Sequence, residues 1–158
     1  MSELKLKRKP DQDETNDLNK LRLECLELLQ ENNFPTDLKN PKQIATSLRQ
    51  FIDVYKVEDV TEKAKNYDKV ELAYGMGELY ANAIIETYNW QYFFIERMDG
   101  FDGFAVVSPD EKWVIFIHHY FHNLLHDKQK SNNSLLNYNM LEPNELQKYK
   151  SENYTPLS

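Results

Sequence analysis

The chain has 158 residues, of which 41% are hydrophobic and 28% are charged, and this is the size and composition of one ordinary globular domain. Its formal net charge is −7. Residues 1–9 hold four basic side chains and one acidic side chain, so the rest of the chain holds 15 basic and 25 acidic residues. A nucleic-acid-binding protein needs a positive field to release counterions, so this charge argues against that class, and it is compatible with a basic protein partner.

The N-terminal segment and the cysteine content indicate the compartment. Residues 1–14 are charged throughout, unlike a secretory signal, and no apolar run approaches the roughly 18 residues of a membrane-spanning helix. Cys25 is the single cysteine, so an intramolecular disulfide is excluded, which is typical of a reducing compartment. We therefore expect a cytoplasmic protein without a membrane partner.

In chain order, we expect a disordered basic head over residues 1–12, one α+β domain over residues 13–150 and a frayed tail over residues 151–158. A first helix is predicted over residues 13–32, where apolar side chains recur at three- and four-residue spacing: Leu18, Leu21, Cys25, Leu28 and Leu29. Because Cys25 lies on this stripe, we interpret it as a core residue and not as a nucleophile.

A second helix is predicted to start with Asn40 as the N-cap and Pro41 at the first helical position. Its buried face is expected to consist of Ile44, Leu48, Phe51, Ile52 and Tyr55. Residues 56–67 are polar and are expected to contain one short helical turn.

The longest helix is predicted over residues 69–88, opened by a capping box with Asp68 at the N-cap and Glu71 at N3. It is apolar around more than half of its girth, so we expect it to be central. Gly75 and Gly77 each cost about 1 kcal/mol relative to alanine in a helix interior. They predict that another element passes close to the helix backbone there. Glu78 either points inward, to a buried tyrosine or a backbone group, or faces solvent.

Three strands are predicted over residues 90–98, 104–107 and 112–117, with turns at residues 99–103 and 108–111. Together they form a small antiparallel meander of three strands or slightly more. Helices are expected to follow over residues 118–128, 134–141 and 143–149. The fold class is therefore α+β and helix-rich. We expect the central helix to pack on the meander through Leu79, Ile84, Trp90, Phe94, Trp113 and Ile115.

All four histidines lie within nine residues: His118, His119, His122 and His126. On a helix, His118, His122 and His126 share one face, and two histidines four residues apart can bind zinc. The glutamate that a zinc protease places directly after its first histidine is replaced here by His119. Three interpretations stay open: an ordinary amphipathic helix whose histidine face is solvated, a pH-responsive or partner-contacting surface, and a metal site. In the first, the buried face consists of Tyr120, Phe121, Leu124 and Leu125. We favour the first and expect no metal.

No segment carries a catalytic or cofactor motif. Residues 75–78 (GMGE) contain G-x-G, but they lack the third glycine and the preceding strand of a phosphate loop. No serine stands in G-x-S-x-G, and no pair of carboxylates is marked by its spacing as an acid–base couple. We expect no enzyme activity and no cofactor.

The predicted hairpin tip places Phe101 among Asp99, Gly100, Asp102 and Gly103. A phenylalanine in a loop either folds back onto the core or anchors a partner protein. Both interpretations stay open for Phe101.

Residues 68–141 resemble a group of small bacterial domains of unknown function, several of which look like immunity proteins encoded beside secreted toxins. The resemblance rests on G-x-G-E at residues 75–78, on Trp90 at the start of a strand, and on V-x-S-P-D at residues 106–110. This chain departs from that pattern at His118 and His119, where a proline is usual. The resemblance implies a protein that binds a toxin acting in the cytoplasm and occludes its active site, which for an acidic inhibitor suits a basic cleft.

On this hypothesis we expect the partner-binding residues to be Asp99, Phe101, Asp102, Asp110, Glu111, His118 and His122. Two alternatives remain: a chaperone or adaptor for a secreted effector, and a hydrolase or metal-dependent enzyme that uses residues 118–126.

Overall fold

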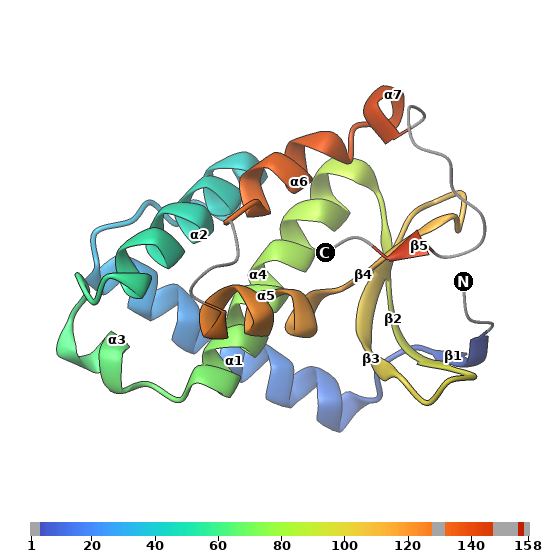
Figure 1. Cartoon of the computed structure of the whole chain (residues 1–158), viewed down its shortest axis with the longest axis horizontal. Helices are drawn as coiled ribbons and strands as arrows, with labels where there is room; N and C mark the ends of the chain where they lie inside the picture. The colour runs from blue at the N-terminus through green and yellow to red at the C-terminus, as the bar shows by residue number, and fades with distance from the viewer. Residues whose placement is uncertain (1–3, 128–131, 147–154, 157–158) are drawn as a thin grey trace.

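The computed structural model describes residues 4–127, 132–146 and 155–156, and it has the helix-rich α+β architecture that the sequence predicts. The helices gather at one end of the molecule and the sheet at the other (Figure 1). The helices are α1 (Gln12–Glu31), α2 (Pro41–Lys56), α3 (Glu62–Asn66), α4 (Lys69–Tyr88), α5 (Ile117–His126), α6 (Ser134–Met140) and α7 (Pro143–Leu146). The strands are β1 (Leu4–Arg8), β2 (Gln91–Arg97), β3 (Asp102–Val107), β4 (Trp113–Phe116) and β5 (Thr155–Pro156).

The sheet contains the predicted meander and two further edge strands. Its order is β1-β2-β3-β4-β5; the first four strands are antiparallel, and β5 pairs with β4 in parallel. The turn between β3 and β4 closes as predicted, because the Glu111 amide donates to the Ser108 carbonyl at 2.9 Å. No helix in the described part of the chain is both long enough and apolar enough to span a bilayer.

The expectation of a disordered head over residues 1–12 is wrong for the residues that the structure describes. Leu4–Arg8 form an edge strand on β2, and α1 begins directly afterwards with a capping box between Asp11 and Glu14. The strand alternates leucine with lysine or arginine. This many basic residues in a short terminal segment is also typical of a solvated tail, which is why the sequence suggested disorder. Basic side chains are also how natural edge strands avoid aggregation. Here Lys7 and Arg8 lie over the rings of Phe93 and Phe94 at 4.7 and 4.5 Å.

The C-terminal region differs from expectation at residues 155–156. Thr155–Pro156 pair with β4, although residues 151–158 were expected to fray. A strand of two residues is too short to show an alternating pattern in the sequence. The pairing forms because β4 offers a free edge to Thr155–Pro156. The predicted helices over residues 118–128 and 143–149 extend beyond the described residues, which end at 127 and 146 in those segments.

Helix α4 is central, as predicted, and contacts α1, α2 and α5. The two glycines lie where neighbours approach its backbone. A Cβ at Gly75 would lie 2.6 Å from the Cys25 Cβ and from the Leu21 carbonyl oxygen of α1. A Cβ at Gly77 would lie 2.7 Å from the His118 ring, at the start of α5. The predicted close approaches are therefore confirmed for both glycines.

The sheet carries buried apolar side chains on both faces. The main core lies between the helices and one face, and it includes five of the six predicted residues: Leu79, Ile84, Trp90, Trp113 and Ile115. A smaller apolar cluster occupies the other face: Ile95, Ala105, Val107, Val114 and Phe116. The prediction for Phe94 is wrong, because its ring is only partly buried beneath Arg8 and beside Phe104.

Candidate functional site

The hairpin between β2 and β3 is held in a defined shape by its own backbone. The Arg97 amide donates to the Phe101 carbonyl at 2.8 Å, and the Gly100 amide donates to the Arg97 carbonyl at 3.0 Å. Gly100 has φ of +88°, a conformation that favours glycine. The Asp99 carboxylate accepts the Phe101 amide at 3.1 Å and also pairs with Arg97. The tip therefore presents its side chains from an ordered turn.

The hairpin tip packs against the beginning of α5. Phe101 packs against His119 with the rings tilted by 40° and 4.6 Å between their centroids, and it meets Phe116 edge to face at 4.9 Å. His119 in turn places its Nε2 3.2 Å from the Asp102 carbonyl oxygen. Phe101 nevertheless remains 37% exposed. The Arg97 guanidinium also lies over the Phe101 ring, 5.0 Å from its centroid. The ring therefore packs against the start of α5 and stays partly exposed, and its role as a partner anchor remains a prediction.

A small pocket of about 130 Å³ continues from this contact across α5 onto α4. It is lined by Val70, Ala73, Tyr74, His118, His119 and His122. Val70 is 48% exposed, and Met98 beside the tip is 61% exposed. We call Val70, Tyr74, Met98, Phe101, His119 and His122 the tip surface. It combines apolar and aromatic side chains with the adjacent carboxylates of Asp99 and Asp102.

A buried polar network lies beneath the tip surface. The Glu78 Oε2 accepts the Tyr92 hydroxyl at 2.6 Å and lies 2.8 Å from the His118 Nε2. Tyr74 packs on the His118 ring at 4.2 Å. Burial, followed by the neighbouring Glu78 carboxylate, raises the pKa of Tyr92 well above its ordinary value, so this hydroxyl keeps its proton and donates. Of the two alternatives for Glu78, the inward one with a tyrosine partner is confirmed.

His118 does not lie on the surface as expected, since its ring is buried against Glu78. Because Gly77 has no side chain, the first turn of α5 approaches α4 so closely that the His118 ring enters the core. The i, i+4 spacing of the histidines did not reveal this contact between two helices. The buried side of α5 is as predicted: Tyr120, Phe121, Leu124 and Leu125.

The remaining histidines stay at the surface. His122 stacks on His126, with 3.9 Å between ring centroids. Burial, and then the neighbouring His126 and His119, lower the pKa of His122, so its imidazole is neutral at neutral pH. Among the described residues, no three histidine, cysteine, aspartate or glutamate side chains are arranged to hold a metal ion.

Asp110 and Glu111 lie in the β3–β4 turn, at the opposite end of β3 from the hairpin tip. Asp110 accepts the Ser108 hydroxyl at 2.6 Å and the Lys112 amide at 3.1 Å, and Glu111 pairs with Lys7 at 2.6 Å. These contacts stabilise the turn and attach it to β1. The structure therefore brings together Asp99, Phe101, Asp102 and His122, but not the two acidic residues of the other turn.

The single cysteine is not placed for chemistry. Cys25 is buried against α4, and burial raises the pKa of its thiol to about 12, so the thiolate needed for nucleophilic attack does not form near neutral pH. This agrees with its interpretation as a core residue.

Sequence reasoning missed Val70, Tyr74 and Met98, which belong to the tip surface. Tyr74 and Val70 lie on a helix that is apolar around more than half of its girth, so its pattern did not show which part of the apolar face stays open. No protein-family model, no curated protein and no solved structure matches the chain.

Proposed function

We propose that this protein acts by binding another protein through the tip surface, as an immunity protein that neutralises a bacterial toxin in the cytoplasm by occluding its active site. The observation that carries the proposal is the partly exposed Phe101, which an ordered turn holds between two carboxylates and a histidine. Interface hot spots combine an aromatic anchor with a polar rim in this way.

The surroundings of Phe101 support a protein partner. Val70 adds exposed apolar area in the lining of the pocket and Met98 adds it in the hairpin, where Asp99 and Asp102 carry acidic side chains. The body of the chain is acidic as a whole, which suits a toxin with a basic cleft, because opposite fields raise the association rate.

Co-expression with the products of the flanking genes tests the proposal. We expect one of them to be toxic alone, to be tolerated with this protein, and to co-elute with it at a fixed stoichiometry. The purified toxin should lose its catalytic activity when one equivalent of the protein is added. A complex in which the partner keeps full activity would indicate a chaperone or adaptor instead. Turnover of a substrate by the protein alone would indicate an enzyme.

Variants of the tip separate the two contributions to binding. Phe101→Ala should mainly speed dissociation, because it removes an aromatic anchor that the partner would bury in the complex. Asp99→Lys with Asp102→Lys should mainly slow association and weaken its salt dependence. Val57→Ala, at a side chain 72% exposed in the α2–α3 connection, is the matched apolar control. Asp17→Lys with Glu27→Lys on α1 changes the net charge equally. If the controls weaken binding as much as the tip variants do, the tip surface is not the interface.

A further inference from the structure

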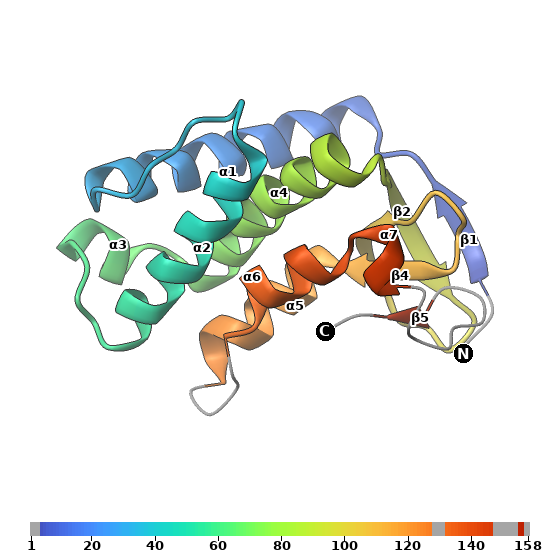
Figure 2. The same cartoon turned by 90° about the horizontal axis from the view of Figure 1, so that it is seen from above.

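A second pocket, separate from the tip surface, is lined by residues of α1, α4 and the beginning of α2 and of the segment before α2. Figure 2 shows how these three helices lie beside one another. It measures about 400 Å³, which is within the range of small-molecule sites. Its apolar wall consists of Leu38, Pro41, Ile44, Leu79 and Ala83. Its polar lining consists of Asn19 and Arg22 from α1 and Asn82 and Glu86 from α4. Spacings of three and four residues put each polar pair on one face of its helix.

Arg22 is the unusual member of this pocket. Its Nε is fully buried, yet it has no hydrogen-bond partner. Within the described residues, the side chains of Arg22, Asn19, Asn82 and Glu86 form no hydrogen bond or ion pair with the protein. Native structures rarely leave a buried donor unsatisfied, because it has lost its water without gaining an acceptor. The unmet donor belongs to a side chain that lines the pocket, and a small movement of the guanidinium into this space would let it meet an acceptor supplied from outside.

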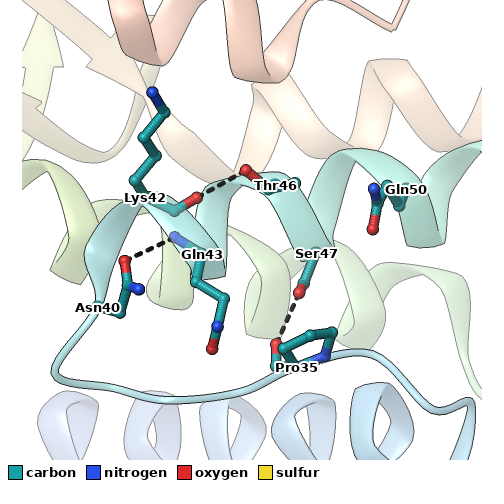
Figure 3. Close-up of a pocket in the computed structure, with 7 residues that line it drawn as sticks. All are labelled: Pro35, Asn40, Lys42, Gln43, Thr46, Ser47 and Gln50. Carbon is teal, nitrogen blue, oxygen red and sulfur yellow. Dashed lines mark hydrogen bonds between the residues drawn. The ribbon is translucent and has the colours of Figure 1, made fainter.

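The polar groove along the first turns of α2 provides the contrast (Figure 3). Three of its side chains have partners in the protein: Asn40 accepts the Gln43 amide at 3.1 Å, Thr46 donates to the Lys42 carbonyl at 2.8 Å, and Ser47 donates to the Pro35 carbonyl at 2.6 Å. That groove is similar in volume but has no unmet buried donor, so it does not point to a ligand.

We propose that the α1–α4 pocket binds a free apolar α-amino acid. The guanidinium of Arg22 presents a planar fork of donors that matches a carboxylate. Glu86 supplies an acceptor of opposite charge for an ammonium group, and the amides of Asn19 and Asn82 can both donate and accept. The wall of Leu38, Ile44 and Leu79 accommodates an apolar side chain. A zwitterion with an apolar side chain uses all three features together.

Isothermal titration with L-leucine, isocaproate and isopentylamine tests each feature separately. Isocaproate lacks the ammonium group of leucine, and isopentylamine lacks its carboxylate. We expect L-leucine to bind, L-serine to bind more weakly, and both half-ligands to bind at least about tenfold more weakly than leucine. Leucine should perturb backbone amide resonances of α1 and α4 and leave those of the hairpin tip unchanged.

Two substitutions assign the binding to the named groups. Arg22→Met keeps the apolar stem and removes the donors, so leucine affinity should fall by about tenfold or more. The unliganded protein should melt no lower than before, because the unsatisfied donor is gone. Glu86→Gln should weaken leucine binding and leave isocaproate binding unchanged. Arg49→Gln on α2 and Glu27→Gln on α1 are matched controls outside the pocket.

Three results would overturn the inference: no heat of binding with L-leucine at millimolar concentration, leucine binding that survives Arg22→Met, or isocaproate binding as tight as leucine binding. If Arg22→Met unfolds the protein, leucine binding is measured with Arg22→Lys instead. Lysine keeps the positive charge but lacks the planar guanidinium that can donate two parallel hydrogen bonds to a carboxylate. Wild-type affinity in Arg22→Lys would equally exclude the guanidinium as the carboxylate ligand.

Discussion

Individual residues in this protein decide how closely its helices approach one another. Gly75 and Gly77 leave α4 without a side chain at the two points where α1 and the start of α5 touch its backbone. The second contact also carries the ring of His118 to the carboxylate of Glu78. The close approach and the buried polar network are therefore one feature, and a methyl group is enough to disturb it.

Gly75→Ala should destabilise the protein although alanine is the better helix former. The new Cβ would lie 2.6 Å from a side-chain atom and from a backbone oxygen of α1, so α1 must move. Overpacking of this kind costs typically about 1–3 kcal/mol, which exceeds the propensity gain of about 1 kcal/mol at its upper end. Thermal unfolding monitored by circular dichroism measures the difference. Asn82→Ala, at an exposed position of the same helix, should leave the melting temperature unchanged or raise it slightly. A Gly75→Ala protein as stable as the wild type would show that α1 shifts freely.

At the scale of elements, the edge strand β1 and the first turn of α1 are joined by one side chain. Glu14 accepts two hydrogen bonds from the Arg8 guanidinium, at 2.7 and 3.0 Å, and closes the capping box on the Asp11 amide at 2.9 Å. The Arg8 hydrogen bond is the main cause that lowers the pKa of Glu14 to about 2 from its ordinary 4.5. The charged Glu14 carboxylate therefore adds a contact between the strand and the helix to the backbone pairing that holds β1 on β2.

Acid should release this contact in a defined pH range. A carboxyl whose pKa is lowered by folding contributes stability that is fully present above its ordinary pKa and is lost as the pH falls towards the lowered value. For Glu14 that window extends from about pH 4.5 down to about pH 2. Glu14→Gln should lower stability at pH 7 and make its loss across this window shallower. Urea denaturation at a series of pH values measures both effects. The neighbouring Asp13→Asn, which has no such partner within the described chain, serves as the control, and identical pH profiles for Glu14→Gln and wild type would contradict the assignment.

At the scale of the whole molecule, stability depends on a core shared by the helices and one face of the sheet. Phe121 is fully buried there, between α5 and α4, in edge-to-face contact with Tyr80. Phe94 lies at the margin of the same face, where Arg8 covers it. A domain of this size has only about 5–15 kcal/mol of stability in total, so the difference between these two sites is easily measured.

The same substitution at both sites compares core with margin. Phe121→Ala should cost about 3–5 kcal/mol, because it removes a ring and leaves a cavity. Phe94→Ala should cost clearly less, since part of that ring already faces the surface and Arg8 can move into the space. Chemical denaturation gives both free energies of unfolding. Equal losses at the two positions would mean that the sheet margin is as tightly packed as the helical core.

The sequence by itself determined the main helices, the meander and the central place of α4. Helix starts were readable because a cap is a local signal: Asn40, followed by Pro41, accepts the Gln43 amide, and Asp68 accepts the Glu71 amide. The predicted capping box at Asp68 forms only in this half, because the Glu71 side chain does not accept the Asp68 amide. The closely packed glycines were also readable, because a glycine within a helix costs stability unless space is short. The hairpin tip was predicted for the same local reason, since its turn residues are adjacent in the chain.

Only the tertiary structure decided which of these groups meet. Leu4–Arg8 became a strand because β2 offers an unpaired edge, and charged residues give no sign of that partner. His118 became a core residue through Glu78, which lies 40 positions earlier in the chain. The separation of Asp110 from the hairpin tip depends on strand direction, and the unpartnered Arg22 donor depends on three helices meeting. Contacts between distant segments depend on packing and solvent exclusion, and local spacing does not record them.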